Sequence, residues 1–309
     1  MPITINDRLY GPHTFTSPVL IELINSPQIQ RMKGISQLGP PDKWCWKKGY
    51  QRFEHSLGVA ILLSKLGAPL ETQVAGLLHD IGHTAFSHVS DFLFGDPEKE
   101  DLNDKLYFST ISSGEISTIL RKYKILPTSI KDIEDFPLLK RKVPNLCADT
   151  VDYCLREMCV DGDYENAQIL LKGVTNFDGK LAFTSQEIAE KYANQFLKMN
   201  HEGWRSWRAV SVYVLMKRML LIAMDNNIIT REDFSGTDQP IIDKLHNSKL
   251  PEIANIIYQL ENQTYEKIDH PKKTRFTDPD FLQDGKLIRL SSVDPEFAKK
   301  IKEITRSWK

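Results

Sequence analysis

The sequence has few cysteines, no long apolar run and almost no excess of charge. Its four cysteines form no CxxC pair, so we interpret them as ordinary buried or surface thiols and not as a disulfide framework. The N-terminus has no secretory signal, and no apolar run approaches the roughly 20 residues that span a bilayer. The formal net charge of -1 offers no global attraction to nucleic acid or membranes. We therefore expect a cytoplasmic protein, or a nuclear one in a eukaryotic cell, with no membrane partner.

Helical periodicity dominates the chain. Apolar residues recur at helical spacing in the segments that we predict to be helices: 17–38 with a break near Pro27, 53–66, 70–94, 112–124, 145–159, 186–225 with a break around Gly203, and an amphipathic C-terminal helix. The acidic segment 96–109 has few apolar residues, so we interpret it as a surface loop.

Two short alternating runs are interrupted by Asp-Gly pairs, at Asp178-Gly179 and at Asp284-Gly285, and each pair favours a β-hairpin. The expected fold class is therefore mainly α, a helical core with one or two small β-hairpins. We predict a main helical domain over residues 1–225. A smaller helical and hairpin region, residues 226–309, is expected to pack on it.

Histidine is concentrated in one part of the chain. Four of the eight histidines lie between residues 55 and 88, and AGLLHDIGHTAFSH contains three of them. On a helix, His79 and His83 share a face and Asp80 lies about 100° round from His79, so all three can border one pocket. An unpaired buried carboxylate costs several kcal/mol, which a bound metal ion removes. This ligand set suits a divalent transition metal such as iron, manganese, zinc or nickel, and suits magnesium less well.

A second interpretation of HDIGH is a variant of the HExxH helix of zinc proteases. Two observations weaken it. Asp is shorter than the Glu that reaches the zinc-bound water in those enzymes, and no obvious third ligand follows close downstream.

Four sequence blocks together carry a specific family resemblance. RMKGISQLG, QRFEHSLGV, AGLLHDIGHTAFSH and ADTVDY occur in this chain in the order seen in HD-superfamily metal-dependent phosphohydrolases. The chain most resembles the deoxynucleotide triphosphohydrolase branch, which includes the enzyme with a sterile alpha motif and an HD domain. DPDFLQDGKLIRLSSVDPEF near the C-terminus is also similar. The resemblance implies an HD-domain helical core within residues 1–225.

The resemblance also implies a set of site residues. The implied metal ligands are His55, His79, Asp80 and Asp149. The residues implied to act beside the metal are His83, His88 and Asp91, of which either histidine would contact phosphate and the aspartate would orient a histidine.

Substrate-binding residues follow from the same resemblance. Arg52 would reach a phosphate, Gln37 and Leu38 the sugar, and Tyr153 the sugar face. An almost neutral protein needs a local cation to hold a phosphate. The other interpretation of Arg52 is a solvated surface arginine.

The chain departs from this branch at three places. In this branch, a helix after the HD motif carries a His-Glu pair whose histidine takes part in the chemistry. The corresponding stretch here, STISSGEIST, has no histidine, and Glu115 is a partial substitute for the pair. Thr150 stands where the branch has a phosphate-contacting lysine, and Asn25 where it has a guanine-reading aspartate. The first two departures lie around the phosphate tail and count against triphosphate cleavage. The third, at Asn25, argues against nucleotide-activated assembly.

The predicted function is metal-dependent hydrolysis of a nucleotide or related phosphoester, with a (deoxy)nucleoside triphosphate as one candidate. One alternative is a nucleotide-binding or scaffold protein of HD fold with impaired catalysis. Another is an HD-type di-iron oxygenase that recruits His83 and His88 as further ligands. The resemblance implies a homo-oligomer, expected to be a dimer.

Nucleic acid is not an expected partner. The basic runs are short, and we interpret them as solvated faces: Lys47-Lys48, Lys140-Arg141-Lys142 and Lys272-Lys273.

Overall fold

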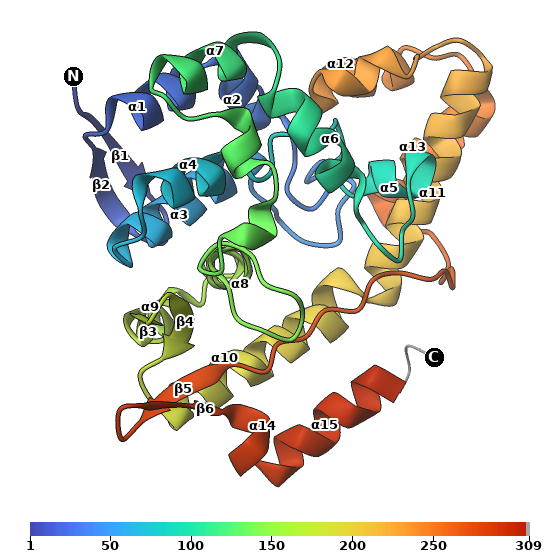
Figure 1. Cartoon of the computed structure of the whole chain (residues 1–309). Coiled ribbons are helices and arrows are strands. Elements are labelled where there is room, and N and C mark those ends of the chain that lie inside the picture. Colours follow the sequence, from blue (N-terminus) through green and yellow to red (C-terminus); the bar gives the residue numbers. More distant parts are fainter. Residues whose placement is uncertain (307–309) are drawn as a thin grey trace.

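The protein is mainly α-helical, which confirms the expected fold class (Figure 1). This computed structural model describes residues 1–306. The α-helices are α1 Pro18–Asn25, α2 Pro27–Arg31, α3 Arg52–Lys65, α4 Leu70–Leu78, α5 Val89–Phe94, α6 Leu102–Ile111, α7 Gly114–Lys122, α8 Ala148–Val160, α9 Tyr164–Lys172, α10 Gln186–Lys198, α11 Trp207–Asp225, α12 Asp238–His246, α13 Pro251–Asn262, α14 Leu290–Val293 and α15 Pro295–Arg306.

Two small sheets accompany the helices. β1 (Ile3–Asp7) and β2 (Gly11–Phe15) form an N-terminal antiparallel hairpin, which the sequence patterns missed together with α9. β3 (Val174–Phe177), β4 (Lys180–Phe183), β5 (Asp280–Gln283) and β6 (Lys286–Arg289) form a four-stranded sheet in that order.

The two predicted Asp-Gly hairpins are both present. Asp178-Gly179 joins β3 to β4, and Asp284-Gly285 joins β5 to β6. All four of these turn residues have positive φ, the conformation that tight two-residue hairpins require. The hairpins meet in one sheet because β4 pairs in parallel with β5, a contact between distant parts of the chain that no local pattern indicates.

Most of the predicted helices are confirmed, including the break at Pro27 between α1 and α2. The break around Gly203 is also confirmed, because a π-helical turn over Met199–Trp204 separates α10 from α11.

The apolar interior consists of two clusters. The larger cluster contains buried side chains of α1–α4, α6–α10 and the C-terminal elements, whereas the smaller cluster joins α5 with α11, α12 and α13. Residues after 225 contribute to both clusters and to the four-stranded sheet. The domain division at residue 225 stays a prediction.

The prediction of one helix over 70–94 is wrong. α4 ends at Leu78, α5 begins at Val89, and the connecting segment 79–88 has no helical hydrogen-bond pattern. The reason is tertiary: Ile81 is buried in the larger cluster and Phe86 in the smaller one, so this segment must cross between them. Phe86 and Ser87 also adopt positive φ, which a helix cannot contain. We call residues 79–88 the HD segment.

The interpretation of 96–109 as a surface loop is also wrong in part. α6 begins at Leu102, and Tyr107 and Ile111 of this helix are buried in the larger cluster. Two apolar contacts are sufficient to hold a helix whose sequence is mostly polar, because tertiary packing outweighs local propensity. Within the described residues, no helix is long and apolar enough to cross a membrane.

Candidate metal centre

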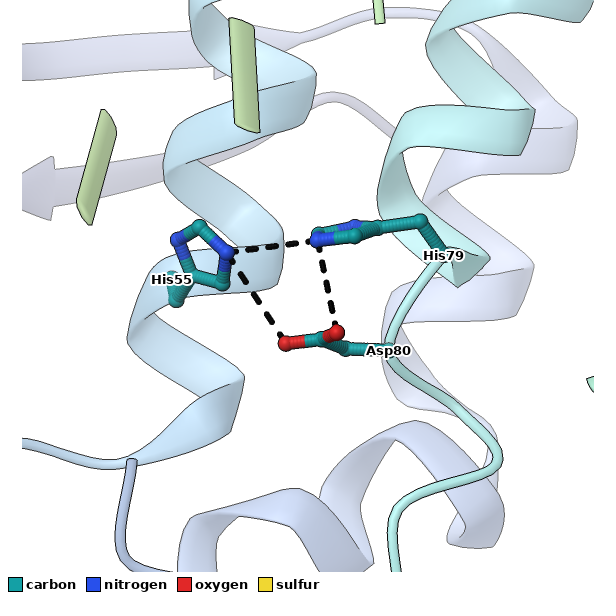
Figure 2. A group of neighbouring side chains, drawn as sticks. All are labelled: His55, His79 and Asp80. Atoms are coloured by element: carbon teal, nitrogen blue, oxygen red, sulfur yellow. Dashed lines mark hydrogen bonds and ion pairs between the residues drawn. The ribbon is translucent and has the colours of Figure 1, made fainter. Parts of the chain in front are cut away.

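Four predicted ligand side chains converge from three parts of the chain. His55 comes from α3, His79 and Asp80 follow the end of α4, and Asp149 lies in the first turn of α8. His55 Nε2 lies 3.2 Å from His79 Nε2 and 3.2 Å from Asp149 Oδ1. His79 Nε2 lies 3.5 Å from Asp80 Oδ1, and Figure 2 shows both imidazoles and this carboxylate facing one another.

These separations fit the edges of a coordination sphere around one ion. Ligand atoms about 2.0 to 2.2 Å from a metal are roughly 3 to 3.5 Å apart in tetrahedral or octahedral geometry. One ligand atom from each of His55, His79 and Asp80 lies within 4.8 Å of the others, and all three residues are buried. These three side chains therefore offer two imidazole nitrogens and one carboxylate to a divalent ion, and the Asp149 carboxylate lies beside both imidazoles as a candidate fourth ligand.

The outer ring nitrogens of both histidines are already committed. His55 Nδ1 lies 2.7 Å from Asp152 Oδ2, and His79 Nδ1 lies 2.7 Å from the carbonyl oxygen of Gly76. Because these oxygens accept hydrogen bonds from N–H, the proton of a neutral ring lies on Nδ1. Nε2 then offers its lone pair to an ion, which at His55 would replace the second ring proton. This is the usual arrangement around a metal-binding histidine.

Two cations neutralise the carboxylates of the cluster. Arg52 Nη1 donates to Asp80 Oδ2 at 2.5 Å, and Lys140 Nζ donates to Asp149 Oδ2 at 2.5 Å. Burial opposes ionisation, but Arg52 holds the pKa of Asp80 well below its usual range, and Lys140 does the same for the pKa of Asp149. Both carboxylates are therefore anionic at neutral pH, as ligands of a metal must be.

An acid that the sequence patterns did not single out lies behind His55, on the side away from the other ligands. Asp152 is fully buried, and besides His55 it binds Arg156 and accepts a hydrogen bond from the hydroxyl of Tyr10. Burial lowers the pKa of His55, but hydrogen bonds to Asp149 and Asp152 outweigh this effect and raise it to about 9. The signal was present in ADTVDY, where residues three apart lie on one helical face.

The chain was compared with known protein families and proteins. Residues 52–135, which contain three of the four candidate ligands, match the HD domain family. The uncharacterized protein YdhJ of Bacillus subtilis is 34% identical over 305 residues, a match that covers 96% of this chain and 93% of that protein. The chain belongs to the HD-domain family.

Two further relatives have names that state an activity. The metal-dependent phosphohydrolase cns2 of Cordyceps militaris is 28% identical, with 92% of this chain and 86% of that protein covered. Human deoxynucleoside triphosphate triphosphohydrolase SAMHD1 is 30% identical, but the match covers 56% of this chain and only 30% of that protein. With its cluster of histidines and carboxylates, this HD-domain protein is a metal-dependent phosphohydrolase.

The four candidate ligand side chains, His55, His79, Asp80 and Asp149, are together called the metal cluster below. A cavity of about 290 Å³ opens beside it. It is lined by all four predicted substrate-binding residues and by two of the three predicted catalytic residues, Gln37, Leu38, Arg52, His83, His88 and Tyr153. Arg52 is only 2% exposed, which excludes the interpretation as a solvated surface arginine.

His83, His88 and Asp91 lie next to the cluster as a connected group. His83 Nε2 is 3.5 Å from Asp80 Oδ1, and the rings of His83 and His88 are 5.1 Å apart. Asp91 Oδ2 lies 3.1 Å from His88 Nδ1, a contact that holds the ring in one orientation. Burial lowers the pKa of His88 well below its usual value.

The HD segment is held in its non-helical path by polar contacts. Asp238 accepts hydrogen bonds from the backbone N–H groups of Ser36 and Phe86, at 2.8 and 2.7 Å. Arg31 donates to the carbonyl oxygen of His83 at 2.7 Å, and Arg52 Nε donates to Ser87 Oγ at 2.7 Å. These contacts hold the HD segment without a continuous helix, and its Asp80, His83 and His88 line the cavity.

Glu115 does not take part in this site. It is exposed on α7 and lines a different pocket, beside the N-terminus, so its interpretation as a partial substitute for a catalytic pair is wrong. The acid that the structure places near His88 is Glu100, whose Oε2 lies 3.9 Å from His88 Nδ1. Glu100 comes from the segment that we had interpreted as a surface loop.

Two of the basic runs also differ from expectation. The interpretation as solvated faces is wrong for Lys140 and for Lys272-Lys273, which are at least half-buried and line the cavity together with Arg275, whereas Lys142 is exposed as expected. Lys272 is only 6% exposed. Short basic runs have the same sequence signature on a surface and in a pocket, so only the tertiary structure separates the two cases.

Proposed function

We propose that this phosphohydrolase acts on a nucleotide, with nucleoside triphosphates, including deoxynucleoside triphosphates, as its substrate class. The observation that carries the proposal is the composition of the cavity. Cationic side chains and aromatic side chains both border the metal cluster, and a nucleotide requires the first for its phosphates and the second for its sugar and base.

The phosphate end would lie beside Arg52 and Lys140. Both cations line the cavity, and each contacts a carboxylate of the metal cluster. A phosphate oxygen bound at the cluster would therefore lie within reach of two positive charges. Thr150, which follows Asp149, stands where the triphosphohydrolase branch has a lysine, and Lys140 supplies a cation beside Asp149 instead.

The sugar and base would lie against the aromatic side chains. The ring of Tyr153 is 6.2 Å from that of His55, and it packs against Phe196 and Trp204 at 5.8 and 5.2 Å. Gln37 Oε1 is buried in the cavity wall and has no hydrogen-bond partner among the described residues. It is a ready acceptor for a sugar hydroxyl.

A metal ion held by His55, His79, Asp80 and Asp149 would lower the pKa of a bound water and offset negative charge on the phosphoryl group. His88 contributes proton transfer. Its Nδ1–H donates to Asp91, which leaves Nε2 of the neutral ring as a proton acceptor. His83 and Arg52 present N–H groups to phosphate oxygens.

The relatives add independent support. Cns2 is named a metal-dependent phosphohydrolase, and SAMHD1 is named a deoxynucleoside triphosphate triphosphohydrolase. The region that aligns with SAMHD1 covers 56% of this chain. A nucleotide substrate is therefore consistent with both the cavity and the similarity.

The test is a hydrolysis assay with nucleoside mono-, di- and triphosphates and manganese. We expect His79→Ala and Asp80→Asn to lower turnover by at least about 100-fold, because each removes a metal ligand. His201→Ala is the matched control, since His201 is exposed and lies outside the cavity. Undiminished hydrolysis by both ligand variants would exclude the assignment of the metal centre.

Other outcomes separate the alternative functions. Tight nucleotide binding without product over long incubation would favour a scaffold protein of HD fold. Two irons per chain with an iron absorption spectrum would favour an oxygenase. Hydrolysis of phosphoesters other than nucleotides would keep the phosphohydrolase and exclude the nucleotide.

A further inference from the structure

The segment between α13 and β5 forms one wall of the cavity. Residues 264–279, here called the C-terminal strap, contain no helix or strand, and Figure 1 shows them running past α11 and α10 toward β5. The strap is fixed by backbone hydrogen bonds from Ile268 to Ser211 Oγ, from Arg275 to Asn200 Oδ1 and from Asp278 to the carbonyl of Pro144. It is therefore a built wall of the site.

Lys272 of the strap is buried without an anionic partner in contact. Its Nζ lies 3.6 Å from the ring centroid of Tyr213 and 5.8 Å from that of Trp46. Within residues 1–306, no oxygen acceptor lies within hydrogen-bond distance of this ammonium group. Lys272 lines the same cavity as the metal cluster, so its free donors are available to a bound molecule.

Arg275, a second cation of the strap, lines the same cavity and is linked through Glu100 to His88. Its Nη2 forms an ion pair with Glu100 Oε2, and the same carboxylate oxygen lies 3.9 Å from His88 Nδ1. A polar path thus leads from Asp80 through His83 and His88 to the strap. Along this path, His83 and His88 lie between Asp80 and Arg275.

A buried ammonium group with no acceptor is unfavourable in the absence of a ligand. Burial lowers the pKa of Lys272 to about 7, with Glu100 opposing this effect and Arg275 adding to it. An anion within reach of Nζ would offset the cost of burial. Nothing in the metal cluster requires this lysine, because Arg52 and Lys140 already contact its carboxylates.

We propose that Lys272 and Arg275 form a second anion subsite, which binds a phosphate of the substrate other than the one held at the metal cluster. The proposal rests on the proposed function and deepens it, because the subsite selects nucleoside di- and triphosphates over monophosphates. Lys272 acts as a specificity residue of the pocket. It takes part in binding and is not placed at the scissile bond.

The test measures binding of two probes, inorganic tripolyphosphate and orthophosphate, by calorimetric titration. The protein is loaded with metal beforehand, and unbound metal is removed before the titration. We expect Lys272→Met to weaken tripolyphosphate binding by about 10- to 100-fold, as expected for loss of a charge-assisted hydrogen bond. Orthophosphate affinity should change much less, since the metal cluster remains. Lys267→Met is the matched control, because this strap lysine is exposed and does not line the cavity.

A second readout distinguishes binding from a purely structural role. A structural lysine would lower the melting temperature when replaced, whereas we expect Lys272→Met to leave that of the ligand-free protein unchanged or to raise it. Arg275→Lys, which keeps the charge, should retain most of the affinity for tripolyphosphate. The second subsite would be overturned if Lys272→Met bound tripolyphosphate as tightly as the wild type does. It would also be overturned if the substitution weakened the affinity for tripolyphosphate and orthophosphate equally.

Failure of the two proposals can be told apart. If no nucleotide is hydrolysed but tripolyphosphate affinity depends on Lys272, the subsite stands and the nucleotide assignment fails. If nucleoside triphosphates are hydrolysed and the ratio of their kcat/KM to that of monophosphates is the same in Lys272→Met, the function stands and the subsite fails.

Discussion

Asp152 shows how a residue beyond the ligands controls the metal centre. Its carboxylate holds the Nδ1–H of His55 at 2.7 Å, and Arg156 and Tyr10 hold the carboxylate in turn. We expect Asp152→Asn to weaken metal affinity by about 10- to 100-fold, because the neutral amide accepts a weaker hydrogen bond from the ring and no longer supports its basicity. Competition with a coloured chelator measures this, with Asp161→Asn, a more exposed acid at the end of α8, as control. Unchanged affinity would show that His55 needs no such support.

Lys272 predicts a pH dependence of stability. Its pKa is lowered to about 7 in the folded protein, chiefly by burial, with Glu100, Arg275, Cys45 and Glu157 as the nearby ionisable groups. An unfolded lysine titrates near pH 10.4, so the cost of burying the charge is absent above this pH and fully developed below about 7. We expect the stability gained by Lys272→Met to grow by about 3 to 5 kcal/mol as the pH falls from about 10.5 to 7. Denaturant unfolding across this range checks it, and a pH-independent difference contradicts it.

At the scale of elements, the HD segment depends on α12. Asp238 at the start of α12 accepts two buried backbone N–H groups, one from Ser36 and one from Phe86. We expect Asp238→Ala to lower the free energy of unfolding by about 2 to 4 kcal/mol, since both donors lose their acceptor. Urea unfolding measures this, with Asp243→Ala on the exposed side of the same helix as control. A change below about 0.5 kcal/mol would show that water replaces the carboxylate at no cost.

The same segment shows which elements local patterns could predict. α7 and α10 follow apolar periodicity because each buries one face, and α3, α8 and α11 are recognisable as apolar-rich helices buried over most of their length. The Asp-Gly turns follow from backbone geometry. The apolar positions between 79 and 88 look helical, yet Ile81 and Phe86 pack in different clusters. α6 has the opposite problem, since its polar sequence hides two buried anchors.

At the scale of the whole molecule, a metal would connect three parts of the fold. Its candidate ligands come from α3, the HD segment and α8, so binding should stabilise the folded chain as a unit. We expect a strong chelator to lower the melting temperature, and manganese in excess to restore it. At a free metal concentration about 100 times the dissociation constant, the gain is about 2.7 kcal/mol. Scanning calorimetry measures the shift, and Asp149→Ala should abolish it. The dimer and the domain division at residue 225 stay predictions.

The sequence by itself determined the chemistry of the centre, because imidazoles and carboxylates in QRFEHSLGV, AGLLHDIGHTAFSH and ADTVDY carry their ligand atoms wherever the chain places them. Only the tertiary structure decided which further side chains share the cavity. Glu100, Lys140 and Lys272 come from separate segments, and each had been interpreted as part of a solvated surface. Local periodicity does not encode such contacts, since they depend on how the strap and α6 pack against helices far away in sequence.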